Sequence, residues 1–302
     1  MTTSGTPSIS LLHRLKNVAR NERVDAQLIQ SRYVAERLLD RLARSPYRDK
    51  FVLKGAMLYV VWKGDAYRAT RDLDLFGDIS ADPVKLVEIF REICAISSSD
   101  SLSFPPDAIR AEAIRETADY GGIRVHLVAT IGRTRLPLVV DIGFGNAIEP
   151  APRLASFPAI FDDAAPRVFV YPREAAVAEK LQTVVALGEA NSRLKDYYDL
   201  YVWSHRFPFD GSTLARSVAA TFQRRHTEVP AGIPPSLTAA YFSSPTRNTE
   251  WRAYLKAGRL DGAPSDFASV GESLGMFANP VLNGIAMKEE FDRGWEGGGP
   301  WR

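Results

Sequence analysis

The 302-residue sequence has little of several residue types that mark other protein classes. It contains one cysteine, Cys94, which excludes an intramolecular disulfide, and its four histidines are too few to favour a Cys/His zinc site. Cys94 lies in an apolar helical pattern, which predicts a core position. No segment approaches the ~20 apolar residues of a membrane span, and the N-terminus lacks a secretory pattern. We therefore expect a cytoplasmic protein that makes no contact with a membrane.

Neither positive nor negative charge is in large excess, because the formal net charge is +2. Hydrophobic residues make up 45% and charged residues 25%, which is ordinary for a globular protein. The length allows one large or two moderate domains. Four prolines within residues 146–168 predict a connector. We expect N-terminal helices and a catalytic core in residues 1–150, and a mainly helical domain in residues 151–302.

Hydrophobic periodicity predicts most of the secondary structure. Helical spacing is expected over residues 11–43, 82–97, 174–187, 191–203, 212–226 and parts of 236–278. Alternation predicts strands at 123–130 and 135–144, joined at Gly132 into a hairpin, whereas residues 109–117 fit a strand or a short helix. We expect residues 1–8 to form a frayed tail. We expect the glycine-rich end, residues 294–300, to be disordered apart from Trp295.

The stretch 51–76 carries the strongest chemical pattern. Residues 51–53 predict a short buried strand, Lys54 and Gly55 a turn, and residues 56–62 an apolar helix. A glycine at a helix start lets backbone N–H groups approach an anion, and the helix dipole favours phosphate there. We therefore expect this turn to bind nucleotide phosphates.

Two aspartates follow this turn. Asp72 and Asp74 would point to the same face of a strand, with Leu73 and Leu75 directed into the core. Neighbouring carboxylates repel each other, and oxygen ligands of this kind suit Mg²⁺ together with substrate phosphates. A bare pair of this spacing is more often an exposed strand end, and phosphatases and glycosyltransferases use it too. The strand–glycine–helix before it favours a nucleotidyltransferase.

Asp141 is a third notable carboxylate. It ends a Leu/Val run, where an unpaired charge would be costly. In a two-metal site a third acid can bind metal or accept a proton. An ordinary strand-end aspartate is the alternative, but Asp72 and Asp74 favour the functional interpretation. His126 is expected to be a satisfied strand residue.

A second group of charges lies further along the chain. Lys180, at the polar edge of a predicted helix, could neutralise nucleotide phosphates, although an isolated lysine is more often solvated. Asp196 and Asp199 are three residues apart and therefore neighbours on a helix. They form internal ion pairs, or one of them holds Lys180 or Arg193 toward the nucleotide.

The first predicted helical region is rich in basic residues. Arg14, Lys16, Arg20 and Arg23 could face a polyanion. Charges of this kind more often form a solvated helix face, and the sequence leaves both interpretations open.

These motifs together resemble the AbiEii/AbiGii nucleotidyltransferase toxin family over roughly residues 33–203. The resemblance rests on Leu53-Lys54-Gly55, Arg68-x-Thr70-x-Asp72-x-Asp74, Asp141, Glu179-Lys180-Leu181 and Lys195-Asp196-Tyr197-Tyr198-Asp199-Leu200-Tyr201. It implies an α+β fold with a polymerase-β-like nucleotidyltransferase core, a small mixed sheet with helices, and a mainly helical C-terminal region. It also implies an NTP substrate, Mg²⁺ (two ions, with Mn²⁺ as a substitute), an RNA acceptor with tRNA favoured, and a cognate antitoxin.

The resemblance also implies roles for individual residues. Asp72, Asp74 and Asp141 would bind metal and, with Lys180, carry catalysis. The nucleotide-binding positions would be Lys54, Gly55, Ala56, Thr70, Lys180, Asp196 and Asp199. The family usually has Gly-Gly or Gly-Ser after the lysine, so Ala56 lacks a hydroxyl that could bond a phosphate. Phosphorylation of Thr70 would add negative charge beside the metals and could silence the enzyme.

The sequence therefore predicts a metal-dependent nucleotidyltransferase toxin that transfers NMP from an NTP to an RNA 3′ end. Two alternatives stay open. One is a nucleotidyltransferase that modifies a small molecule. The other is a non-catalytic partner protein with the same fold, which the retained aspartates and Lys180 argue against.

Overall fold

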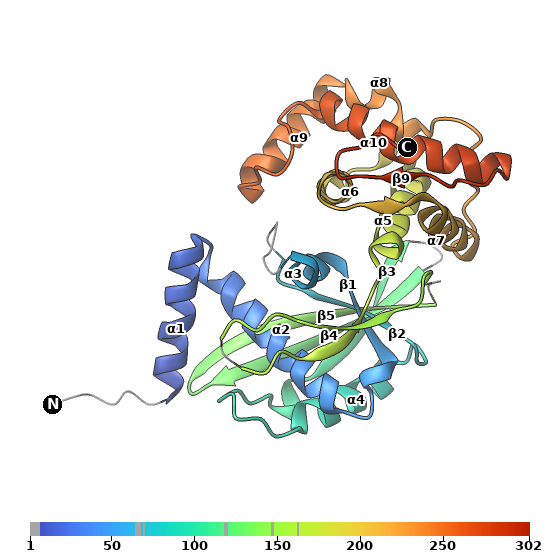
Figure 1. Ribbon diagram of the computed structural model, residues 1–302. Helices are drawn as coiled ribbons and strands as arrows, with labels where there is room; N and C mark the ends of the chain where they lie inside the picture. Colours follow the sequence, from blue (N-terminus) through green and yellow to red (C-terminus); the bar gives the residue numbers. More distant parts are fainter. Residues whose placement is uncertain (1–6, 64–67, 69, 118–119, 146–147, 162) are drawn as a thin grey trace. The chain divides into compact units, whose positions relative to one another are not determined.

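The structure is a computed structural model that describes residues 7–63, 68, 70–117, 120–145, 148–161 and 163–302 (Figure 1). Most of the predicted tail at residues 1–8 lies outside these residues, and the first helix begins at Pro7. The chain divides into two compact units. The first comprises Met1–Gly145 and Arg153–Val170, and the second comprises Asn146–Pro152 and Tyr171–Arg302. The chain therefore passes between the units three times.

Seven strands of the described residues form one mixed sheet in the first unit, in the order β3-β4-β5-β2-β1-β7-β6. They are β1 (Phe51–Lys54), β2 (Leu73–Gly77), β3 (Arg110–Thr117), β4 (Tyr120–Ile131), β5 (Thr134–Phe144), β6 (Arg153–Ser156) and β7 (Arg167–Val170). β2 runs antiparallel to β1 and parallel to β5. The predicted α+β fold with a mixed sheet is confirmed.

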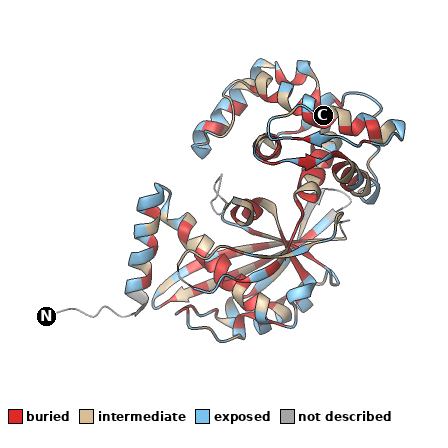
Figure 2. Cartoon of the chain, viewed as in Figure 1, coloured by how far each residue is buried: buried red, intermediate tan, exposed pale blue. Residues whose placement is uncertain are grey.

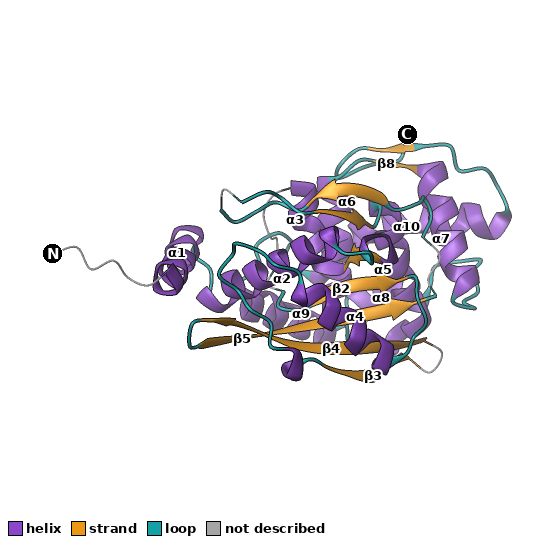
Figure 3. Cartoon of the chain, turned by 90° about the horizontal axis from the view of Figure 1, so that it is seen from below, coloured by secondary structure: helices purple, strands orange, loops and turns teal. Residues whose placement is uncertain are grey.

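The β4–β5 hairpin forms as alternation predicted, with Gly132 at a positive φ of 58° in the turn. Along β5, Leu136, Leu138, Val140 and Ile142 are buried in turn. Helices α2 (Ala26–Arg44) and α4 (Pro83–Ala95) contact each other and the sheet (Figure 3). The two helices cover the apolar side of the sheet. Because side chains alternate along a strand, the polar residues of β5 point to the other face.

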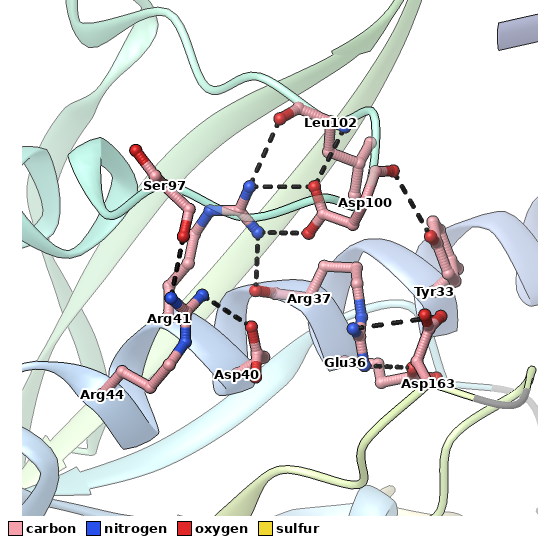
Figure 4. Close-up of polar contacts among 10 residues, drawn as sticks. All are labelled: Tyr33, Glu36, Arg37, Asp40, Arg41, Arg44, Ser97, Asp100, Leu102 and Asp163. Atoms are coloured by element: carbon pink, nitrogen blue, oxygen red, sulfur yellow. Dashed lines mark hydrogen bonds and ion pairs between the residues drawn. The ribbon is translucent and has the colours of Figure 1, made fainter. Parts of the chain in front are cut away.

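Helix α2 also holds two loops through buried charged side chains (Figure 4). Arg41 donates to both carboxylate oxygens of Asp100, at 2.5 and 3.0 Å, and to the carbonyl of Leu102. Glu36 accepts from the backbone N–H of Ile160 at 2.8 Å and pairs with Arg37. These contacts fix the loops beside the sheet without reaching the predicted site residues. Helix α1 (Pro7–Glu22) packs on α2.

The second unit is mainly helical, as expected. Its helices are α5 (Arg173–Leu187), α6 (Leu194–Arg206), α7 (Gly211–Arg224), α8 (Ala239–Phe242), α9 (Pro245–Gly258) and α10 (Phe267–Met287). Aromatic rings fill its core: Tyr197 contacts Phe242 and Phe267, and Trp251 stacks on Phe267 at 4.9 Å. Figure 2 shows buried residues running through these helices and through the sheet strands of the first unit.

Two expectations were wrong. Residues 146–168 are more than a connector, because they contain β6 and the start of β7, which pairs parallel to β1. The end of the chain is ordered, because the short strand β9 (Gly294–Trp295) pairs with β8 (Phe209–Asp210) and Trp301 stacks on Phe277 at 5.8 Å. Buried aromatic area offsets the conformational freedom of the neighbouring glycines.

Two smaller expectations concern apolar segments. Cys94 is buried in α4, which confirms its core position, and burial raises the pKa of its thiol to about 12. Within the described part of the chain, we find no helix with the length and apolar character that crossing a membrane requires.

Candidate active site

The turn after β1 is shaped by a close approach to Asp74. Gly55 adopts a φ of 71°, in the left-handed region, and a Cβ at this position would lie 2.1 Å from Asp74 Oδ2. Only glycine therefore allows the turn and the carboxylate to lie in contact. Ala56 follows, buried in a 3-10 turn that leads into helix α3 (Leu58–Lys63).

Strand register brings four charged residues into one row across the sheet. Lys54 of β1 lies opposite Asp74 of β2, Asp74 lies opposite Asp141 of β5, and Asp141 lies opposite Arg124 of β4. Neighbouring strands are about 4.8 Å apart, so each member lies beside the next. We call Lys54, Asp74, Asp141 and Arg124 the charged row.

Lys54 reaches across this row. A Cβ on Gly143 would lie 3.1 Å from Lys54 Nζ, so the ammonium group lies over the backbone of β5 just beyond Asp141. Glycine at this position leaves the space that the lysine head occupies. Two cations and two carboxylates are thus gathered on the face of the sheet away from α2 and α4.

Asp72 differs from Asp74 in its position. It is exposed and lies directly before the first residue of β2, while Asp74 is half-buried within the strand. Leu73 and Leu75 are buried, as the alternation predicted. The hydrogen bonds and charge of Asp141, together with the charges of Asp72 and Glu112, raise the pKa of Arg124 against the opposing effect of its burial. Asp72 therefore contributes to the field of the same site.

Arg124 is the residue that sequence reasoning missed. Its Nε donates to Asp141 Oδ1 at 2.8 Å and its Nη2 donates to Oδ2 at 2.7 Å. The bidentate geometry fixes the carboxylate in the plane of the guanidinium. A signal was present, since pairing the predicted strands around Gly132 puts Arg124 opposite Asp141. His126 of the same strand contacts Glu112 at 2.9 Å, which confirms it as a satisfied strand residue.

Thr70 lies in the segment before β2. Its hydroxyl donates to the backbone carbonyl of Asp72 at 3.3 Å. This bond connects Thr70, the predicted phosphorylation site, to Asp72, which lies next to the charged row.

Lys180 and its aspartates form a separate cluster in the second unit. Lys180 Nζ of α5 lies 2.8 Å from Asp196 Oδ1 and 2.7 Å from Asp199 Oδ2, both on α6. Arg193 contacts the other oxygen of Asp196 at 2.9 Å. Asp196 thus contacts both Lys180 and Arg193, and Asp199 contacts Lys180; that they hold these residues toward the nucleotide stays a prediction.

Burial sets the electrostatics of this cluster. The side chains of Asp196 and Asp199 are 3% and 0% exposed, and that of Lys180 is 15% exposed. Burial alone would raise the pKa of Asp196, but the charges of Lys180 and Arg193 outweigh it and lower that pKa. Asp196 is therefore an ionised partner of Lys180 and Arg193.

The charged row fits a divalent cation. Asp74 and Asp141 offer carboxylate oxygens from neighbouring strands, and a carboxylate has about four acceptor sites, of which Arg124 uses two on Asp141. Across the residues that the structure describes, no group of three or more His, Cys, Asp or Glu side chains is arranged to hold a metal ion. One or two carboxylates plus substrate phosphates is the pattern that Mg²⁺ uses.

Comparison with protein families gives one match, over residues 37–273, to the nucleotidyl transferase AbiEii toxin of a type IV toxin–antitoxin system. The match spans more than half of the chain. The chain belongs to the AbiEii nucleotidyltransferase toxin family. The resemblance predicted from the motifs is confirmed, and the AbiEii protein is a nucleotidyltransferase. None of the curated proteins compared with it matches.

Solved structures show the same fold. MenT4, a nucleotidyltransferase toxin from Mycobacterium tuberculosis, is 16% identical, with 94% of this chain and 100% of that chain covered and a TM-score of 0.51. JHP933 from Helicobacter pylori is 14% identical, with 87% and 95% covered and a TM-score of 0.50. At these identities the likeness concerns the fold.

Proposed function

We propose that this AbiEii protein transfers a nucleoside monophosphate from an NTP to the 3′ end of an RNA, with tRNA the favoured acceptor. The reaction is metal-dependent, and a cognate antitoxin neutralises it. One observation carries the proposal. Asp74 and Asp141 lie opposite each other on neighbouring strands, beside Lys54 and the Gly55 turn.

In this mechanism Asp74 and Asp141 hold divalent metal, Mg²⁺ or Mn²⁺, and the exposed Asp72 supplies further oxygen ligands. Bound metal stabilises the attacking and leaving oxygens. The RNA 3′ oxygen attacks the α-phosphorus in line, the bond to the bridging oxygen breaks, and pyrophosphate leaves. Asp141 would bind metal or accept the proton of the hydroxyl. The aspartates would hold two ions together with substrate phosphate.

The groups around β1 are proposed to bind phosphate. Lys54 carries a positive charge on the face of the charged row, and the backbone of Gly55 and Ala56 opens the helical segment that follows. Lys180, held by Asp196 and Asp199, is proposed to neutralise nucleotide phosphate. A lysine that is already fixed loses less conformational freedom when the nucleotide binds.

The antitoxin could act on Thr70. A phosphate on this hydroxyl would add about two negative charges close to Asp72 and weaken binding of the triphosphate. Mass spectrometry of the toxin after co-expression with its antitoxin tests this. An unmodified Thr70 in a fully inhibited toxin would contradict it.

The proposed function is tested by incubating the purified protein with total RNA, Mg²⁺ and each labelled NTP in turn. Label in a tRNA-sized band that requires Mg²⁺ and is absent with Asp74→Asn supports the proposal and reports the preferred base. Label in a small molecule from a cell extract, with none in RNA, would favour the small-molecule alternative. No transfer and no nucleotide binding would favour a non-catalytic partner protein.

A further inference from the structure

Helix α1 and the residue that follows it carry a concentrated positive charge. Residues 7–23 contain four Arg or Lys residues and one Glu, a net charge of +3, while the whole chain carries +2. Residues 7–21 contain no acidic residue. The helix begins before residue 37, where the family match starts.

Three of the basic residues form a stripe, which we define as Lys16, Arg20 and Arg23. Lys16 and Arg20 are one helical turn apart, and Arg23 follows the end of the helix with a φ of 57°. All three are exposed, and none forms an ion pair with a residue that the structure describes. Like charges at this spacing repel each other, while the helix dipole favours cations at this end of α1, and the two effects on folding oppose each other.

The other side of α1 is committed to packing. Leu11, Leu15 and Ala19 are buried, and α1 contacts α2. Arg14 lies over the ring of Phe161 at 3.9 Å. Because Leu11, Leu15 and Ala19 are already covered, they are not available to insert into a lipid surface. The stripe therefore suits a polyanion in water.

We propose that the stripe binds the phosphate backbone of the RNA acceptor. The inference rests on the proposed function, and it adds the surface of the AbiEii toxin that holds the substrate. Lys16 to Arg23 spans about 10 Å along the helix axis. Three cations over this length can contact successive phosphates of one nucleic-acid strand. The stripe lies in the same unit as the charged row.

Helix α9 provides a matched control within the same chain. Arg252, Lys256 and Arg259 are exposed and have the same spacing, and Arg259 follows its helix with a φ of 51°. They line a cavity of about 370 Å³ that Asp261 also lines, and this acid would repel phosphate. Both stripes lie at the negative end of a helix, so the helix dipole affects them equally.

The test compares Lys16→Gln/Arg20→Gln/Arg23→Gln with Arg252→Gln/Lys256→Gln/Arg259→Gln. Binding of labelled tRNA is measured by fluorescence anisotropy without NTP, from 50 to 300 mM salt. We expect the α1 triple variant to bind about tenfold more weakly, and its slope of log affinity against log salt to fall by about 2. The α9 triple variant should keep the wild-type slope. Circular dichroism confirms that both variants are folded.

Several outcomes would overturn the inference. They are an unchanged affinity and slope in the α1 variant, or an equal loss in both variants. RNA binding that persists while the cognate antitoxin no longer binds would assign the stripe to a protein partner instead. NMP transfer is measured separately. Wild-type protein that binds tRNA through the stripe but transfers no label would contradict the proposed function and leave this inference standing.

Discussion

The charged row of the sheet and the cluster around Lys180 use the same kinds of groups in different surroundings. Asp196 and Asp199 are enclosed and hold basic residues at under 3 Å. The side chain of Asp141 is 15% exposed although Arg124 contacts both of its oxygens, and Asp72, directly before β2, is exposed. The comparison teaches that enclosed aspartates are fully committed to their partners, while the aspartates of the sheet keep some access to a ligand from solvent even where one of them is paired.

The largest effect is expected from the charged row. Asp74→Asn removes a carboxylate charge without changing the shape of the side chain, so NMP transfer should fall by at least about 1000-fold, while the free energy of unfolding changes by under about 1 kcal/mol. Label incorporation and urea denaturation measure the two quantities. Asp78→Asn, in an exposed residue just after β2, is the matched control and should keep full activity. Retention of a tenth of the activity by Asp74→Asn would refute the catalytic role.

In the cluster around Lys180, a substitution should lower stability rather than activity. Asp199→Asn leaves Lys180 with one carboxylate partner in a buried site, so the free energy of unfolding should fall by about 3 kcal/mol. Urea denaturation measures this loss. Asp49→Asn breaks an exposed pair with Arg48 and should cost under about 1 kcal/mol. Equal stability of the two variants would erase the distinction between the two regions.

Acid should weaken the cluster around Lys180 within a defined range of pH. The charges of Lys180 and Arg193 outweigh burial and keep the pKa of Asp196 low in the folded state. The stability from ionised Asp196 is therefore fully present above its unfolded pKa of about 3.9, and it is lost as pH falls through the lower folded pKa. Asp196→Asn should flatten the acid limb of unfolding free energy against pH. An unchanged limb, measured by urea denaturation between pH 2 and 5, would contradict this.

The smallest effect concerns Arg124, whose charge lies beside Asp141. Arg124→Gln removes a cation that competes with metal for this carboxylate, so the apparent dissociation constant of Mn²⁺ should fall about fivefold. Electron paramagnetic resonance of free Mn²⁺ measures it without NTP or RNA. Arg135→Gln, an exposed position of β5, should leave it unchanged. Weaker Mn²⁺ binding by Arg124→Gln would show that the arginine positions Asp141 for metal.

Local patterns allowed much of the fold to be predicted. The alternation of β4 and β5 and the helical spacing of α4 act within a few residues, so the sequence shows them directly. The strand–glycine–helix at residues 51–63 is of the same kind. Helical spacing predicted that Asp196 and Asp199 are neighbours, and their pairing with Lys180 was one of two alternatives that the sequence left open.

Features that depend on distant contacts were missed. β6 and β7 are four residues each, too short to show a period, and β7 is fixed by pairing with β1. Trp301 is held by Phe277, which no local rule connects to a glycine-rich end. Arg124 became visible as a site residue only once the register of the hairpin was known.

The position of β7 has a consequence for the chain as it leaves the ribosome. β1 is an interior strand of the finished sheet, but its parallel neighbour is made only at residues 167–170, more than a hundred residues after β1. At 5–20 residues per second this interval lasts roughly 6–25 s. Throughout it, one edge of β1 has no β7 to pair with, which makes the nascent toxin a substrate for chaperones and a risk for aggregation. The sheet that carries the charged row is therefore completed only late in synthesis.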